Sequence, residues 1–164
     1  MRPEARSVKV DSVEAHPVSE LLACPAGTGI LLTTSARSLN FALGEVIFRQ
    51  SSLCAGLYLV VSGQLVRRTE QLQTRIVLGT SRPGDLLELA AALGDRYHTY
   101  SLVGQTSGSL LMLPIESLHE AFQSYPPLRM KLLEELAREV SRAYRACRTS
   151  KMVRSRRRTA APLL

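Results

Sequence analysis

The chain has 164 residues, 45% of them hydrophobic and 21% charged, which suits one compact domain. It has no run of the roughly 18 apolar residues that a membrane-spanning helix needs, and no signal-peptide hydrophobic region, so we expect a cytoplasmic protein. The formal net charge is +7, but eight of the 21 Lys and Arg residues fall between Arg142 and Arg158, where there is no acid. The positive excess therefore belongs to the C-terminal end.

Residues 1–20 are mixed in character and polar. His16-Pro17 disfavours a continuous helix there, because the residue before a proline avoids the helical region. The segment from Val18 to Cys24 fits a short helix that ends before Pro25. Ala26-Gly27-Thr28-Gly29 predicts a turn, since it lacks the Gly-Lys-Ser/Thr ending of a phosphate-binding loop.

From about Ile30 to Pro114, short apolar runs alternate with turn residues. The runs that predict strands are Val46–Phe48, Leu57–Leu65 with a break at Ser62-Gly63, Arg75–Leu78, Tyr100–Val103 and Leu110–Leu113. Glycine-containing turns between such runs favour a β-sandwich or barrel. The segment Leu86–Leu93 differs, because its Leu and Ala content predicts a short helix between strands.

Two helices are predicted after Pro114. The first is amphipathic and covers Glu116–Ser124, and the second follows Pro126-Pro127 and runs from Leu128 to Cys147 or beyond. Apolar residues of the second helix recur at 3-4-3-4 spacing, namely Leu133, Leu136, Val140, Ala143 and Cys147. This spacing is typical of a coiled-coil seam and predicts a dimer. Two heptads are equally compatible with packing of the helix against the chain's own β region.

No residue pattern indicates catalysis or metal binding. The histidines and cysteines are dispersed along the chain, at His16, His98, His119, Cys24, Cys54 and Cys147. They provide no paired metal-ligand spacing, no disulfide framework and not the four thiolates of an iron–sulfur cluster. There is also no Gly-x-Ser-x-Gly nucleophile motif. The sequence therefore predicts a non-enzymatic protein without a metal site.

Three glycines stand at the edges of predicted strands, each beside a polar residue: Gly44-Glu45, Ser62-Gly63-Gln64 and Gly84-Asp85. Glycine supplies positive φ where a strand turns a corner. Together with the runs Leu43–Arg49, Gly56–Leu65 and Arg82–Asp85, this spacing resembles the cyclic-nucleotide-binding domain, and most closely that of the Crp/Fnr transcription regulators. The resemblance continues through Leu113-Pro114, the Glu116–Phe122 helix and Tyr125-Pro126-Pro127, and it spans about residues 38–150.

The resemblance implies a mainly β fold with flanking helices: a double-stranded β-helix, or jelly-roll-like β-roll, followed by a long dimerisation helix. It divides the chain into an N-terminal extension (1–29), a β-roll with inserted short helices (30–125), a dimerisation helix (126–150) and a basic tail (151–164). The tail resembles the lead-in to the family's winged helix-turn-helix, and no recognition helix follows it. Its basic residues could neutralise phosphates without reading bases, the candidates being Arg148, Lys151, Arg154, Arg156, Arg157 and Arg158.

The effector-binding segment departs from the family's pattern. In cyclic-nucleotide binders a Glu holds the ribose hydroxyl and an Arg pairs with the cyclic phosphate. Here Glu88 lies one position early, and the place of the arginine falls on His98 beside Thr99, with Arg96 two residues away. The resulting effector-pocket candidates are Gly84, Glu88, Leu89, Arg96, His98 and Thr99. These departures favour an effector other than cyclic AMP or cyclic GMP, whose binding is the alternative.

We therefore expect the sensor module of a Crp/Fnr-family transcription regulator that forms a homodimer and binds a small effector. One alternative is a stand-alone cyclic-nucleotide-binding domain. A second is a non-specific nucleic-acid binder that acts through the basic C-terminal arm. No membrane partner is expected, and DNA would be bound through a missing domain or weakly through the tail.

Overall fold

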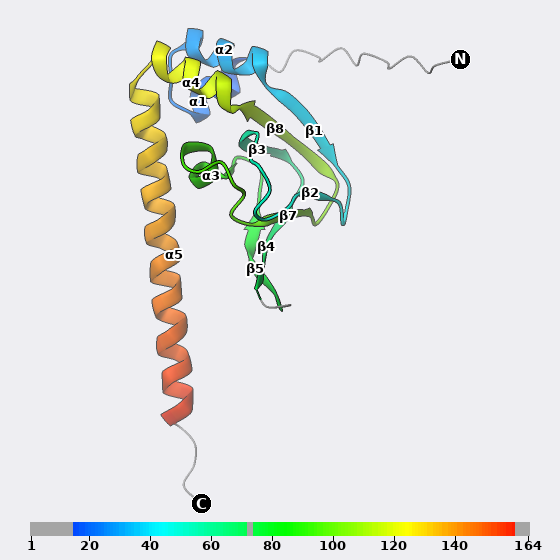
Figure 1. The fold of residues 1–164 in the computed structure, drawn as a ribbon, viewed down its shortest axis with the longest axis vertical. Coiled ribbons are helices and arrows are strands. Elements are labelled where there is room, and N and C mark those ends of the chain that lie inside the picture. The colour runs from blue at the N-terminus through cyan, green and yellow to red at the C-terminus, as the bar shows by residue number, and fades with distance from the viewer. Residues whose placement is uncertain (1–14, 72–73, 160–164) are drawn as a thin grey trace, which may run out of the picture.

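The computed structural model describes residues 15–71 and 74–159 (Figure 1). The elements in chain order are α1 (Ala15–Leu21), α2 (Ala26–Ser35), β1 (Arg37–Phe41), β2 (Val46–Phe48), β3 (Gly56–Ser62), β4 (Leu65–Gln71), β5 (Thr74–Ser81), β6 (Leu86–Leu87), α3 (Leu89–Leu93), β7 (Ser101–Gly104), β8 (Gly108–Pro114), α4 (Ile115–Ser124) and α5 (Pro127–Thr159). The predicted strand runs and the two C-terminal helices are confirmed. Strands β1 and β4 were not predicted as separate elements.

The strands form two antiparallel four-stranded sheets, in the orders β1-β8-β3-β6 and β2-β7-β4-β5. The sheets face each other and enclose an apolar core that includes Phe41, Val60, Leu65, Leu102 and Leu110. This arrangement confirms the predicted β-roll. All three glycines at the predicted corners have positive φ, with values of 79° at Gly44, 81° at Gly63 and 92° at Gly84.

A second apolar core joins the outer face of the first sheet to the helices. Leu32 of α2, Leu113 of β8, Leu118 of α4 and Leu128 of α5 are almost fully buried there. Burial of each such leucine contributes about 1.5–3 kcal/mol. Figure 1 shows α1, α2 and α4 grouped at one end of the sheet, from which α5 runs alongside and away from the β-roll.

The predicted turn at residues 26–29 is wrong, because these residues begin α2. Gly29 is buried in the contact with α1, where a Cβ would lie only 2.5 Å from the Cβ of Ser19. This glycine therefore serves close helix–helix approach instead of a turn. Hydroxyl groups at the end of α2 donate to carbonyls one turn earlier, as from Thr33 to Gly29 at 2.7 Å, and the first strand starts only at Arg37.

The predicted helix at residues 86–93 is correct only in its second half. Leu86–Leu87 forms β6, which pairs with β3, and α3 covers Leu89–Leu93. Glu88 separates the two elements because its backbone is left-handed, with φ 69° and ψ 33°. None of the helices in the described part of the chain is long and apolar enough to cross a membrane.

Candidate functional site

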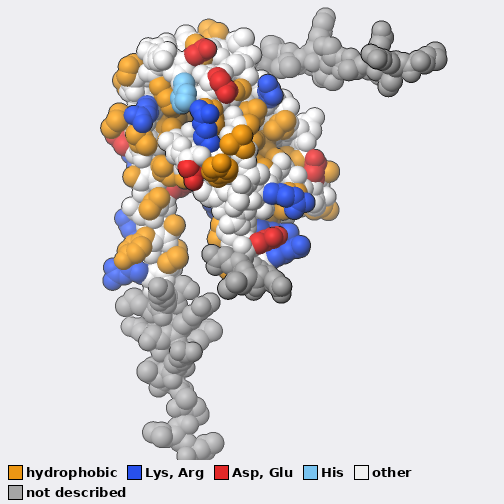
Figure 2. All heavy atoms as spheres, in the orientation of Figure 1, with side chains coloured by type: hydrophobic (Ala, Val, Ile, Leu, Met, Phe, Trp, Pro, Cys, Tyr) orange, Lys and Arg blue, Asp and Glu red, His pale blue; other side chains and the backbone are white. Residues whose placement is uncertain are grey.

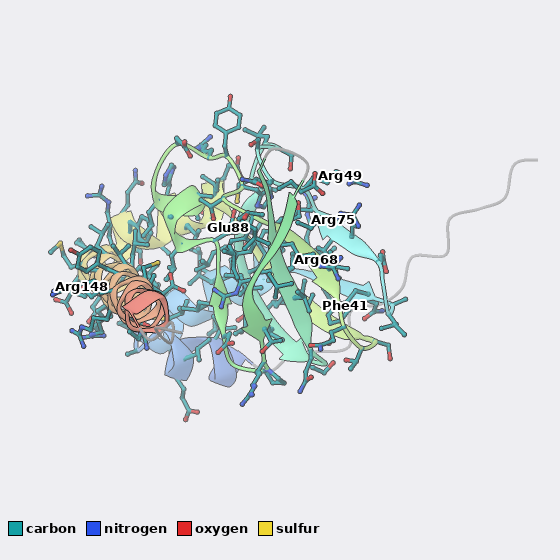
Figure 3. The ribbon with its side chains drawn as sticks, turned by 90° about the horizontal axis from the view of Figure 1, so that it is seen from below. Phe41, Arg49, Arg68, Arg75, Glu88 and Arg148 are labelled. Carbon is teal, nitrogen blue, oxygen red and sulfur yellow. The ribbon has the colours of Figure 1, made fainter. Side chains whose placement is uncertain are left out.

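The centre of the candidate site is Glu88, a buried carboxylate between β6 and α3. Figure 3 shows it in the interior, between α3 and the strands, and the residue is only 4% exposed. A left-handed backbone costs a residue with a side chain roughly 1–2 kcal/mol. The contacts of the carboxylate must therefore offset both this strain and the loss of water around the charge.

Three hydrogen bonds satisfy the Glu88 carboxylate. Its Oε2 atom lies 2.7 Å from Nδ1 of His98 and accepts a bond of 3.0 Å from the backbone N–H of Thr99. Its Oε1 atom accepts a bond of 2.7 Å from the Thr99 hydroxyl. The side chains of His98 and Glu88 are 2% and 0% exposed. The structure thus brings together three of the predicted pocket residues, and it does so in a cluster closed on itself.

Aromatic side chains fill the space around this cluster. The ring of Phe48 stacks on His98 with a centroid distance of 3.7 Å and an interplanar angle of 9°, and Tyr58 packs against both rings. Burial raises the pKa of Tyr58 to about 12, and burial together with the nearby Glu88 also raises the pKa of Tyr100. Both phenols are therefore neutral neighbours of the carboxylate.

Cys54 completes a group of three metal-ligand types, because one ligand atom from each of Cys54, Glu88 and His98 lies within 4.8 Å of the others. Sequence spacing gave no sign of this convergence. The thiol already contacts the Gly56 carbonyl at 3.0 Å, and burial raises the pKa of Cys54. Around tetrahedral zinc, N and O ligands stand about 3.3 Å apart, so a metal would have to open the 2.7 Å contact between His98 and Glu88. We assign no metal to this group.

The other predicted pocket residues lie around the cluster. Arg96 has an exposed side chain and a left-handed backbone with φ 67°, and its carbonyl accepts a bond of 2.7 Å from the N–H of Cys54. Arg96 thus contacts the site through its backbone carbonyl and not through its guanidinium. Gly84 and Leu89 belong instead to the wall of a cavity beside the cluster.

This cavity lies between the β-roll and α5 and has a volume of about 1010 Å³. Its walls come from Leu21–Ala23 at the end of α1, from β4 and β5, from Gly84–Leu87 and Leu89, and from the face of α5 between Lys131 and Cys147. A volume of this size is at the upper end of what small-molecule pockets have. Leu87 and Leu89 line it on either side of Glu88 in sequence, so the cavity and the closed cluster share one segment.

Sequence reasoning missed Arg67 of β4, which also lines the cavity. Its Nε is the one buried side-chain nitrogen or oxygen without a hydrogen-bond partner in the part of the chain that the structure describes. Its guanidinium carbon lies 5.8 Å from the centre of the Tyr100 ring. Alternation along a strand was the available signal, because Arg67 lies two residues after the fully buried Leu65 and so shares its face.

The predicted seam of α5 is only partly covered by its own chain. Leu133 and Leu136 are half-buried, whereas Val140 is 60% exposed and Ala143 and Cys147 are exposed. Figure 2 shows hydrophobic side chains along the described part of α5 beyond the β-roll. The alternative of packing against the chain's own β region therefore applies only to the first turns of this helix.

Of the basic arm, Arg148 is exposed on α5 and projects from it in Figure 3. The side chains of Lys151, Arg154, Arg156, Arg157 and Arg158 lie outside the described residues. Their predicted contact with nucleic acid stays a prediction.

Comparison with known proteins shows what the chain resembles. The sequence profile of the cyclic nucleotide-binding domain matches residues 38–125, which are 88 of the 164 residues. No curated protein matches the sequence.

Several solved structures share the fold. The sensor domain of the transcriptional regulator DNR from Pseudomonas aeruginosa is 16% identical with a TM-score of 0.68, covering 78% of this chain and 91% of that one. The N-terminal domain of a transcriptional regulator from Streptomyces coelicolor A3(2) is 21% identical with a TM-score of 0.61, covering 77% and 91%. The catabolite activator protein of Thermus thermophilus is 24% identical with a TM-score of 0.68, covering 78% and 60%.

Proposed function

Because the chain belongs to the cyclic nucleotide-binding domain family, we propose that it is the non-enzymatic sensor module of a Crp/Fnr-type transcription regulator. Its effector is a small molecule other than a cyclic nucleotide, and it dimerises through α5. The likeness in fold to sensor and N-terminal domains of transcriptional regulators supports the regulatory part of this proposal.

The closed cluster of Glu88, His98 and Thr99 carries the proposal that the effector is not a cyclic nucleotide. The resemblance placed the ribose-binding Glu and the phosphate-binding Arg at or near Glu88 and His98. Here these two side chains bind each other at 2.7 Å and are buried. A cyclic phosphate at this place would meet a buried carboxylate at close range and no arginine, and like charges in a low-dielectric interior repel strongly.

Calorimetric titration with cyclic AMP and with cyclic GMP tests this proposal. We expect no binding tighter than about 100 μM, which corresponds to about −5.5 kcal/mol. Arg96→Ala serves as the matched variant, because Arg96 is exposed and lies two residues from the position where the resemblance expects the phosphate-binding arginine. Micromolar binding that disappears in Arg96→Ala would show that Arg96 binds the phosphate and would overturn the proposal.

Dimerisation rests on the exposed apolar residues of α5. We expect a dimer by light scattering at tens of micromolar. Leu136→Lys and Val140→Lys should each produce monomers with the β-roll still folded, because charges buried at a seam without a partner are costly. Ser141→Lys is the matched control, since Ser141 is exposed on the same helix but lies outside the predicted seam. A monomeric wild-type chain would overturn this part of the proposal.

Weak nucleic-acid binding through the basic arm is the second candidate function, favoured by the eight basic residues between Arg142 and Arg158. It should be salt-dependent and indifferent to sequence, because phosphate neutralisation releases counterions without reading bases. Deletion of residues 148–164 should abolish it. Binding that survives the deletion would rule out the arm as its source.

A further inference from the structure

Arg67 enters the cavity between the β-roll and α5 without a hydrogen-bond acceptor for its Nε. A buried donor without an acceptor costs about 1–3 kcal/mol, and more when it is charged. The Tyr100 ring, 5.8 Å from the guanidinium carbon, offers only a weak compensating contact. The Nε–H of Arg67 therefore has no acceptor among the residues that the structure describes.

The local backbone leaves room for this guanidinium. The register of β4 against β5 shifts between Arg67 and Arg68, and Gly79 lies opposite Arg67. A Cβ on Gly79 would lie 2.9 Å from Nη2 of Arg67, and the φ of 150° at Gly79 disfavours any residue with a side chain. This register shift is a β-bulge, which changes the direction of nearby side chains. Because Gly79 has no Cβ, the Arg67 side chain can lie against β5.

Most other charged groups of the cavity already have partners. On α5, Arg142 pairs with Glu135 at 2.8 Å and Arg138 pairs with the same Glu135 at 3.1 Å. Nζ of Lys131 donates to the carbonyl of Ala23, so its charge is also engaged. Among the other described residues that line the cavity, Asp85 accepts a bond from the backbone N–H of Arg82. Arg67 on one wall and the half-buried Glu139 on α5 form no ion pair within the described part of the chain, although the charge of Arg67 acts to lower the pKa of Glu139.

Much of the remaining wall is apolar. Leu78, Leu87, Leu89 and Leu132 face the cavity, and Leu89 and Leu132 are almost fully buried. Such a surface favours a ligand with an apolar part, because binding removes both the ligand's hydrocarbon and the leucine side chains from water. The cavity therefore combines a guanidinium whose Nε lacks an acceptor among the described residues with leucine side chains that can pack against hydrocarbon.

We propose that Arg67 binds the carboxylate of an amphipathic organic acid whose apolar part lies against these leucines. This inference rests on the proposed function, since the acid is the effector that takes the place of a cyclic nucleotide. The planar guanidinium fork matches a carboxylate. A single negative charge is favoured over two, because Glu139 shares the cavity and repels further negative charge.

Calorimetric titration of the full chain with octanoate tests the proposal, with 1-octanol and inorganic phosphate as comparison ligands. We expect octanoate to bind at least tenfold more tightly than 1-octanol, which has the same apolar body without the charge, and more tightly than phosphate. Arg67→Gln should weaken octanoate binding at least tenfold. Arg68→Gln is the matched control with unchanged affinity, because Arg68 does not line the cavity and lies on the side of the strands away from α5 (Figure 3).

Glu139→Gln gives a result that misfolding cannot imitate. It removes the competing negative charge, so octanoate should bind several-fold more tightly than to the wild-type chain. Octanoate that binds no better than 1-octanol, or equal losses in Arg67→Gln and Arg68→Gln, would overturn the inference. Titrations with cyclic AMP and light scattering on the same samples separate the two proposals: only micromolar cyclic AMP binding or a monomeric chain would count against the proposed function.

Discussion

Replacement of Glu88 by alanine should remove much of the stability of the folded chain. The change deletes the acceptor of three hydrogen bonds and leaves His98 buried without its partner. A buried hydrogen-bonding group left without its partner costs about 1–3 kcal/mol, and three such bonds are lost here. The groups of Thr99 recover part of the loss from water, because Thr99 is exposed. We expect a loss of about 4 kcal/mol, against a total of about 5–15 kcal/mol for a domain of ordinary stability.

Glu88→Gly separates the hydrogen bonds from the backbone strain. Both variants lose the same three bonds, but glycine adopts the observed φ of 69° freely and alanine does not. The glycine variant should therefore be about 1 kcal/mol more stable than the alanine variant.

Urea unfolding followed by circular dichroism measures both differences at one fixed protein concentration, since association changes apparent stability. With a slope of about 2 kcal/mol/M, the alanine variant should shift the midpoint down by about 2 M with the slope unchanged. A loss below about 1 kcal/mol in Glu88→Ala would refute the importance of the cluster. A glycine variant less stable than the alanine variant would refute the argument from backbone strain.

Three further predictions concern the cavity and a buried thiol. Burial raises the pKa of Glu139 above its ordinary value of 4.5, so the folded chain binds this proton more tightly than the unfolded chain and stability falls as the pH rises above about 4.5. Glu139→Gln should flatten that fall and raise stability at neutral pH by less than about 1 kcal/mol, and an unchanged pH profile of the urea midpoint would contradict this. At pH 7.5 a thiol reagent should modify the buried Cys54 only on unfolding, because burial excludes the reagent and raises the pKa of Cys54; rapid modification of Cys54 in the folded chain would be inconsistent with the structure. Gly79→Ala should lower stability by about 1 kcal/mol and weaken octanoate binding, because the added Cβ displaces the Arg67 guanidinium. Urea unfolding measures the change in stability and titration the change in affinity. Unchanged affinity would count against the role of Gly79 in leaving room for Arg67.

The β-roll was predictable because its strands are marked by short apolar runs and its corners by glycines at positive φ. Helix α2 was not, because Pro25, Gly27 and Gly29 have the local preferences of a turn. Tertiary packing overrides those preferences: α1 lies so close to Gly29 that a larger residue would not fit. The split of residues 86–93 at Glu88 also has a tertiary cause, since the left-handed backbone is held by bonds to a residue ten positions later.

Part of the candidate site was likewise predictable from the sequence, and part was not. The family resemblance directed attention to Glu88, His98 and Thr99, which the structure brings together. That they bind one another is a property of their distances, which no spacing along the chain expresses. Cys54 joins them from more than thirty residues away in sequence, so no local motif could have placed it beside them. Arg67 was visible in principle as an arginine on the inward face of a strand, but its exceptional position depends on the bulge and on Gly79 opposite.

The cavity wall on α5 and the far end of that helix share one unbroken backbone from Pro127 to Thr159. An α-helix turns by about 100° and rises about 1.5 Å with each residue. One residue inserted after Cys147 would therefore rotate everything beyond it by about 100° around the helix axis and leave the cavity untouched. Seven inserted residues would bring it back to within about 20° of its first direction, some 10 Å further along. The number of residues in α5 thus sets the direction, around the helix axis, in which residues beyond Cys147 point relative to the cavity.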